Sequence, residues 1–209
     1  MSHPIHTENY KGLTIKVWAD EYTESPDQWG NTDAFIVYDH RSFSVERDGF
    51  DPEAIHEHLQ SGGKLFDGHH VFPLYAYIHS GVSLSLGRSS YPFTCPWDTS
   101  LRGFVLVKRQ KGWSWNRTKA EKVAQSIVSE WNDYLSGNVY TYTVEDSQGN
   151  NLDACAGFYG DYDSEGGALD QAREAAHGEY LTAVKRHLKK VATWITNRVP
   201  LINRTPFAV

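Results

Sequence analysis

The amino-acid sequence predicts an α+β fold, in which an antiparallel or mixed sheet packs with a middle helix and a long C-terminal helix. Segments in which apolar and polar residues alternate, the pattern of a half-buried strand, recur along the chain. Two longer segments carry apolar residues at the three- and four-residue spacing of a helix. The strands cluster around these helices and do not alternate regularly with them, which disfavours a parallel βαβ array.

Strands are expected where alternating or apolar runs are bounded by turn residues. In the first half of the chain these runs cover residues 13–18, 34–38, 42–47, 71–78, 82–86 and 103–108. Pro73 lacks a backbone N–H, so its strand should lie at a sheet edge or begin after the proline. Residues 20–33 and 87–102 contain glycine and proline at turn positions and are expected to be loops.

A short helix is expected after Asp51, because aspartate is a good N-cap and Pro52 suits the first helical position. The glycine pair 62–63 should end this helix. Later in the chain, residues 139–146 and 151–159 flank a turn-rich segment and are expected to form an antiparallel hairpin.

The middle helix is expected over residues 118–135, where apolar residues recur at helical spacing. Thr118 as N-cap with Glu121 three residues later matches a capping box, and Gly137 supplies a stop signal. The last helix is expected from residue 168 to about residue 198, followed by an extended tail.

An apolar stripe runs along the C-terminal helix at alternating spacings of three and four residues. It consists of Leu181, Val184, Leu188, Val191 and Ile195. Because such a stripe is normally buried, we expect the helix to pack on the rest of a single domain. Residues 1–167 would then form a mixed α/β body, and residues 168–209 a long basic amphipathic helix and tail.

Length and composition predict a soluble protein of the cytosol. The 209 residues suit one domain. Residues 1–11 are polar and lack the apolar core of a signal peptide, and no apolar run approaches the roughly 20 residues that cross a bilayer. Cys95 and Cys155 cannot build a disulfide framework, and both are expected to be reduced.

Charge is segregated along the chain, although the net charge is only −6. Residues 123–171 contain no lysine or arginine, whereas residues 181–209 contain no acidic residue. Such an asymmetry influences which partners approach the protein.

Three parts of the chain carry a resemblance to a known family: residues 72–81, residues 93–98, and residues 137–140 together with residues 154–161. They contain the sequences His-Ser-Gly, Cys-Pro-Trp-Asp and Gly-Phe-Tyr-Gly, respectively. Together they resemble a family of small proteins encoded by bacteriophages and mobile elements, over roughly residues 72–161. The resemblance carries over no catalytic residue. It implies a phage accessory protein in a bacterial cytosol, of the kind that acts against host defence by binding a nuclease or its complex.

Some residues could serve catalysis or metal binding. Cys95 with His79 and Asp98 could form a nucleophile, base and orienting carboxylate, although a packed turn explains the same residues. Four histidines that lie close together in the sequence could bind zinc, or could be exposed residues of a short helix and loop. They are His56, His58, His69 and His70. Residues 161–166 match the opening of a calcium loop but lack its final glutamate, and an acidic turn before a helix explains them too.

Two charged sets are candidate partner-binding surfaces. The acidic set could imitate DNA phosphates in a nuclease channel, or simply be a solvated face. It consists of Glu130, Asp133, Glu145, Asp146, Asp161, Asp163 and Glu165. The basic set could bind phosphates, the protein's own acidic body or a second subunit. It consists of Lys185, Arg186, Lys189 and Lys190.

The leading hypothesis from the sequence is a phage-encoded, non-catalytic inhibitor without a cofactor. It would bind a host defence nuclease or CRISPR complex, through a DNA-mimicking acidic face. One alternative is a metal-dependent hydrolase or nuclease of phage nucleic-acid metabolism. Another is a nucleic-acid-binding protein that uses the basic C-terminal helix, and a homo-oligomer is compatible with each of these.

Overall fold

The computed structural model describes residues 3–30, 32–87, 93, 95, 97–110 and 116–198. The described chain divides into two compact units. The central unit comprises residues 20–139, and the terminal unit combines residues 1–19 with residues 140–209. Neither boundary coincides with the expected boundary after residue 167. The expected tail after Arg198 and most of the loop 88–96 lie outside the described residues.

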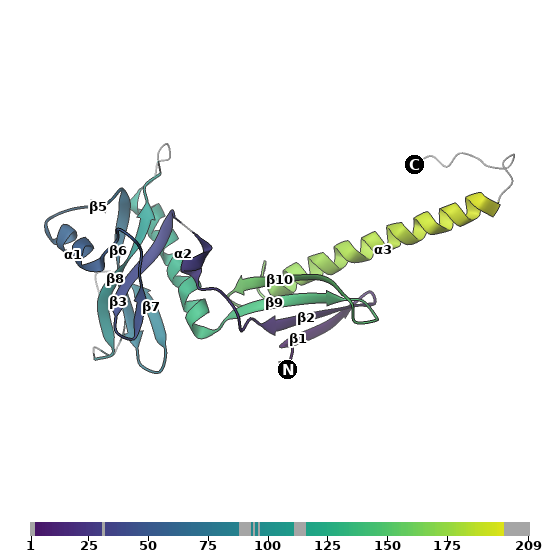
Figure 1. Cartoon of the computed structure of the whole chain (residues 1–209), viewed down its shortest axis with the longest axis horizontal. Coiled ribbons are helices and arrows are strands. Elements are labelled where there is room, and N and C mark those ends of the chain that lie inside the picture. The colour runs from purple at the N-terminus through teal and green to yellow at the C-terminus, as the bar shows by residue number, and fades with distance from the viewer. Residues whose placement is uncertain are drawn as a thin grey trace. The chain divides into compact units, whose positions relative to one another are not determined.

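The central unit is built on one antiparallel sheet with the strand order β4-β3-β8-β6-β5, and β7 pairs with β6 (Figure 1). Its elements are η1 (Pro26–Trp29), β3 (Ala34–His40), β4 (Phe43–Val45), α1 (Pro52–Gln60), β5 (Leu65–Phe66), β6 (His69–Ile78), β7 (Val82–Leu86), β8 (Thr99–Lys108) and α2 (Arg117–Ser136). The sequence located each of these strands except β5, although β8 begins four residues earlier than expected.

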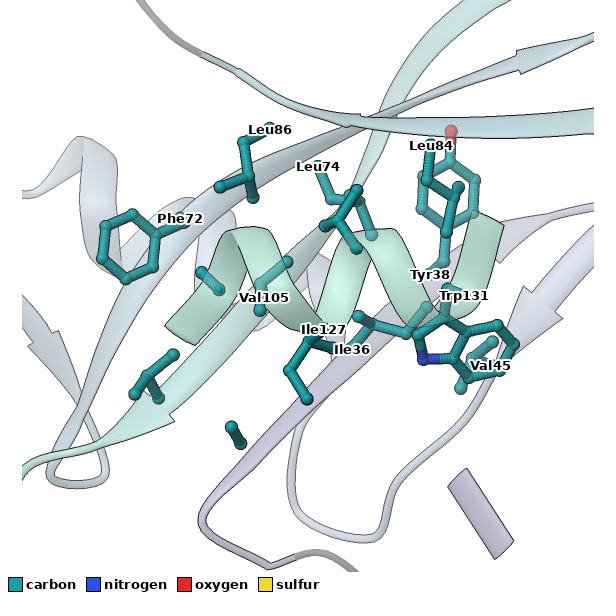
Figure 2. Close-up of a cluster of buried hydrophobic side chains, with 14 of the residues drawn as sticks. Ile36, Tyr38, Val45, Phe72, Leu74, Leu84, Leu86, Val105, Ile127 and Trp131 are labelled. Atoms are coloured by element: carbon teal, nitrogen blue, oxygen red, sulfur yellow. The ribbon is translucent and has the colours of Figure 1, made fainter. Parts of the chain in front are cut away.

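The helices of the central unit cover opposite faces of its sheet. Figure 2 shows α2 lying across one face, where Ile127 and Trp131 pack against Ile36, Leu74 and other strand residues. On the other face Ile55 of α1 is buried with Phe35 and Leu106. The sheet is therefore the middle of three layers, which explains why β3 and β8 read as continuous apolar runs.

Pro73 lies inside β6, so the expectation of an edge strand or a later start was wrong. β6 pairs with β8 on one side and with β7 on the other. The carbonyl of Pro73 accepts a hydrogen bond from Gly87 at 2.7 Å, so its backbone faces β7. The pairing of β6 with β7 ends at Leu74 and Leu86, next to the proline. The backbone N–H that Pro73 lacks would therefore lie at the end of this pairing, where its absence breaks no hydrogen bond within the ladder.

The helix caps confirm one prediction and correct another. The Asp51 side chain accepts hydrogen bonds from Glu53 and Ala54 N–H, as expected of the N-cap of α1. The N-cap of α2 is Asn116, whose side chain accepts from Lys119 N–H at 3.0 Å, and not Thr118. Asparagine caps at least as well as threonine, which moves the helix start by two residues.

The terminal unit joins both ends of the chain in a sheet with the order β1-β2-β9-β10 (Figure 1). Its elements are β1 (His6–Tyr10), β2 (Leu13–Ala19), β9 (Val139–Glu145), β10 (Asn151–Tyr159) and α3 (Ala168–Arg198). Strand β2 pairs antiparallel with β9, so that Ile15 lies opposite Val144. Strand β1 was not expected from the sequence.

The first turns of α3 cover one face of this sheet. Ala168, Leu169, Ala172 and Ala176 are buried there against side chains of β2 and β9. The small side chains of the three alanines let the helix backbone approach the sheet closely. The two antiparallel sheets, the middle helix and the long C-terminal helix together confirm the α+β fold class. Among the described residues no helix is both long and apolar enough to cross a membrane.

Candidate functional site

The helix α3 extends well past the sheet that supports it (Figure 1). At a rise of about 1.5 Å per residue, its 31 residues span about 46 Å. A seven-residue strand such as β9 spans only about 23 Å at 3.3 Å per residue. The last buried residue of α3 is Ala176, so the rest of the helix has no sheet beneath it.

Contacts from β1 and from Lys11, the residue that follows it, hold the supported part of α3 in place. Glu8 accepts two hydrogen bonds from the Arg173 guanidinium at 2.8 and 2.7 Å, and these lower the pKa of the Glu8 carboxyl. The Tyr10 hydroxyl lies 2.8 Å from Nδ1 of His177. Lys11 Nζ sits 4.4 Å from the centre of the Tyr180 ring. These anchors end at Tyr180.

The apolar stripe begins where the anchors end, and it is largely uncovered. Leu188 is 60% exposed, and Leu181, Val191 and Ile195 are each about 40% exposed. The expectation that the whole helix packs on its own domain therefore needs correction: only its first turns do so. The strands are too short to reach the stripe. Its 3-4 repeat is the pattern that pairs with another helix in a coiled coil.

The basic set lies beside this stripe. Lys185, Arg186, Lys189 and Lys190 are exposed, and no described residue forms an ion pair with them. At about 100° per residue, Lys185 lies roughly 40° from Leu181 around the helix, and Lys190 lies on the opposite side. Positive charge thus borders one side of the stripe and continues around the back of the helix.

The sequence-based prediction overlooked Trp194, which is 56% exposed. Its indole lies under the Arg198 guanidinium, 4.3 Å from the ring centre. Trp194 falls outside the 3-4 repeat, which is why the periodicity did not select it. Exposed tryptophan and arginine are enriched at the centres of protein interfaces. Residues 181–198 therefore combine an apolar seam, an aromatic anchor and positive charge, and are hereafter called the distal segment.

The acidic set does not lie on a single unit. Glu130 and Asp133 belong to α2 in the central unit, whereas the others belong to the terminal unit. Burial and the neighbouring Asp133 raise the pKa of Glu130. Some of the others have structural tasks in the terminal unit. Glu145 pairs with Lys16 at 2.7 Å, and Asp146 accepts hydrogen bonds from Gln148 and Asn150 in the hairpin turn.

One cluster of the acidic set remains open to a partner. Asp161, Asp163 and Glu165 are exposed in the loop between β10 and α3. The backbone carbonyl of Asp161 accepts hydrogen bonds from Ser164 N–H and its hydroxyl, so the loop is held as a turn. The described residues contain no group of three or more histidine, cysteine or acidic side chains arranged to bind a metal ion.

The residues proposed for nucleophilic catalysis do lie together, but in an unsuitable order. Asp98 Oδ2 is 3.3 Å from His79 Nδ1 and 3.4 Å from Cys95 Sγ. A catalytic base has to lie between the nucleophile and the carboxylate that orients it. Here the carboxylate lies between the other two side chains. This arrangement suits a fixed turn, and Thr99 Oγ1 reinforces it by donating to the Cys95 carbonyl.

The candidate zinc histidines make separate contacts. His58 Nε2 lies 2.7 Å from the Leu65 carbonyl, and His69 Nδ1 lies 2.7 Å from the Asp67 carbonyl. His56 contacts Gln60, and His70 belongs to a different surface. The structure therefore does not bring these histidines together as a ligand set.

Comparison with models of protein families, with curated proteins and with solved structures found no match for this chain. The resemblance to phage-encoded proteins thus stays a hypothesis, and the surfaces described above carry the functional argument.

Proposed function

We propose that this protein is a non-catalytic binding protein that recognises an acidic amphipathic helix of its partner through the distal segment of α3. The observation that carries this proposal is the uncovered 3-4 stripe with positive charge along one border. Burying a leucine, valine or isoleucine side chain is worth about 1.5–3 kcal/mol. A helix laid along this seam would therefore gain affinity from the stripe and orientation from the charges.

Charge favours a foreign acidic helix over a second copy of α3. The distal segment contains five basic residues and no acidic residue; the basic residues are Lys185, Arg186, Lys189, Lys190 and Arg198. Two such segments side by side would bring like charges together, which costs free energy. A partner helix with glutamate or aspartate beside its own apolar stripe would instead pair with them.

The proposed setting follows the resemblance to phage-encoded proteins. We propose a partner from the defence machinery of a bacterial host, such as a nuclease or CRISPR complex, met in the bacterial cytosol. The exposed Asp161, Asp163 and Glu165 would offer a second contact, to the basic nucleic-acid channel of such a nuclease. This version of the DNA-mimic hypothesis needs only one loop of the terminal unit, and not the whole acidic set.

The test compares Leu188→Asp with Ala183→Asp in affinity capture from bacterial lysates. Both changes add the same charge to the distal segment, but Ala183 lies roughly 120° from the centre of the stripe at 100° per residue. We expect Leu188→Asp to abolish capture of a stoichiometric partner and Ala183→Asp to retain it. The captured protein should contain an acidic amphipathic helix, and a peptide of that helix should compete.

Sedimentation of the purified protein completes this test. A monomer at micromolar concentration agrees with the proposal. A dimer that Leu188→Asp dissociates would assign the stripe to a second copy and would contradict it, as would equal capture by both variants.

Nucleic-acid binding by the same helix is a second candidate, because its lysines and arginines are exposed and unpaired among the described residues. It predicts a mobility shift of DNA or RNA at low salt that weakens steeply as salt is added. The double change Lys189→Glu with Lys190→Glu should remove that shift, whereas Leu188→Asp should leave it. Absence of any shift at 50 mM salt would dismiss this candidate.

A further inference from the structure

The central unit contains a basic pocket on the side of its sheet where β5 and β6 meet the start of α2. The pocket has a volume of about 590 Å³. This lies within the range of about 300–1,000 Å³ that is typical of small-molecule sites. None of its lining residues belongs to the distal segment, so the pocket is independent of the function proposed above.

Cations from three separate elements converge on this pocket. Lys64 precedes β5, Arg109 follows β8, and Arg117 is the first residue of α2. The described residues that line the pocket include no acidic residue. Lys64 and Arg109 are exposed, and neither forms an ion pair with a described residue. Three uncompensated cations around one cavity create a strong preference for an anion.

Arg117 is held in position to contact a ligand. Its guanidinium donates a hydrogen bond to the Val71 carbonyl at 3.2 Å and stacks 4.6 Å from the centre of the Phe72 ring. These two contacts restrict the side chain before a ligand arrives, which reduces the entropy lost on binding. No other described residue accepts a hydrogen bond from the guanidinium, so its remaining N–H groups could form the paired hydrogen bonds that phosphate oxygens accept.

His70 adds a polar atom without a partner. Its Nε2 is shielded from solvent and makes no hydrogen bond in the structure. Burial, together with the neighbouring Arg117 and Arg109, lowers the pKa of His70. A buried polar atom without a hydrogen bond costs free energy. A rotation of the ring that turns Nε2 into the pocket would let a ligand oxygen accept a hydrogen bond from it and relieve that cost. The lone Nε2 is therefore a second sign, besides the charges, that a ligand belongs here.

The rest of the pocket wall is apolar. Leu59, Leu65, Val71 and Pro73 line it beside the cations. A bare inorganic anion would contact the cations but would make no contact with this apolar wall. A ligand that joins an anionic group to a flat or apolar group would use both sides.

We propose that this pocket binds a small phosphate-bearing molecule of nucleotide size. Arg109, Arg117 and Lys64 would hold the phosphate, and His70 Nε2, after rotation of its ring toward the pocket, would donate a hydrogen bond to one of its oxygens. The apolar wall would contact the base or another planar group.

Calorimetric titrations of the full-length protein with ADP, inorganic pyrophosphate and adenosine test this proposal. We expect ADP to bind most tightly, pyrophosphate more weakly and adenosine not measurably. Arg109→Glu should weaken ADP binding at least about tenfold, because it replaces a charge-assisted hydrogen bond by repulsion. Arg41→Glu, an exposed arginine of the same unit outside the pocket, should leave binding unchanged.

Three outcomes would overturn the proposal. One is equal binding of adenosine and ADP, and another is no Arg109-dependent binding of either phosphate compound. The third is an Arg109-dependent preference for a single-stranded oligonucleotide over ADP, which would assign the pocket to a nucleic-acid chain. Circular dichroism of both variants ensures that a loss of binding is not a loss of folding.

The role of His70 has its own readout, the pKa of its ring followed by nuclear magnetic resonance. Sulfate serves as the probe because it does not change protonation between pH 5 and 8. Sulfate in the pocket should raise the pKa of His70 in the wild type, because its negative charge favours the protonated ring. It counteracts the positive charges of Lys64, Arg109 and Arg117, which favour the neutral ring. The same sulfate should have a much smaller effect in Arg109→Glu. An unchanged His70 pKa at saturating sulfate would remove His70 from the site.

Discussion

At Gly103, strand β8 passes so close to β3 that a side chain would not fit. A Cβ atom at this position would overlap the Tyr38 ring and the Val37 carbonyl. Gly103 pairs with Tyr38 on one side and with Leu74 on the other, next to an irregularity in the register of β6 and β8. The glycine thus leaves room for the ring of Tyr38, the largest fully buried side chain among the described residues.

Gly103→Ala is therefore expected to destabilise the protein by about 3 kcal/mol, since a packed core tolerates added volume poorly. Denaturation with urea measures the change in unfolding free energy. Gly81→Ala is the matched control, because a Cβ atom there meets nothing within 4 Å. Equal stability of the two variants would show that the strands separate easily at Gly103.

A second residue-scale effect depends on pH. Hydrogen bonds from Arg173 hold the pKa of Glu8 below its ordinary value, and His6 adds to this effect. The stabilisation is thus fully present above pH of about 4.5, the range in which Glu8 of the unfolded chain is also ionised. It is lost as the pH falls through the lower pKa of the folded protein.

Arg173→Met should accordingly reduce the unfolding free energy at pH 7 and have a smaller effect at pH 3. The measurement is urea denaturation at both values of pH. Arg186→Met removes an arginine without a carboxylate partner and should be nearly neutral at both. A loss for Arg173→Met that is independent of pH would mean that packing, and not the ion pair, holds α3 on β1.

At the scale of elements, α2 shows how a cap sets a helix boundary. Both Asn116 and Thr118 are residues that cap helices, and the sequence alone favoured Thr118 because Glu121 completes a capping box. In the structure Asn116 has the extended backbone of an N-cap, and Thr118 lies within the first turn. Ala120 and Ala124, which follow this cap within two turns, are buried in the core that α2 forms with the sheet.

Asn116→Ala should therefore cost about 1 kcal/mol of stability, the usual loss on removing a cap. Thr118→Ala should change the unfolding free energy by less than about 0.5 kcal/mol, since Thr118 is exposed. Thermal unfolding followed by circular dichroism at 222 nm compares the two. A larger loss of stability for Thr118→Ala than for Asn116→Ala would show that Thr118, and not Asn116, caps the helix.

The longest element, α3, has two halves with different environments. Residues 168–176 supply its buried side chains, whereas the distal segment is uncovered. Helices of this kind gain most of their stability from packing, so the distal segment contributes little to the fold and is available for a partner.

At the scale of the whole molecule, this division predicts that a chain ending after Tyr180 keeps the fold. Its terminal unit retains the sheet, the buried part of α3 and the contacts of Glu8 and Tyr10. Amide hydrogen exchange should show unchanged protection of β2 and β9 in this shortened chain. If their protection collapsed, the distal segment would be packed in solution, and the proposed docking surface would be wrong.

Most secondary structure of the protein was determined by short stretches of sequence. The alternation of residues 13–18, the cap at Asp51 and the stop at Gly137 act over a few residues, so their structures could be predicted locally. The same holds for the repeat and the charge of the distal segment, which were visible before any fold was known.

The tertiary structure alone decided which of these segments meet. The β2–β9 pairing that joins Lys16 to Glu145 spans 129 residues, and local sequence preferences carry no information about such distant pairs. The pocket around His70 combines side chains from separate elements, none of which forms a motif. Whether the stripe of α3 is covered depends on the length of the strands beneath it. Periodicity shows that a helix has an apolar face, but only the packing of the whole chain determines whether that face stays open to a partner.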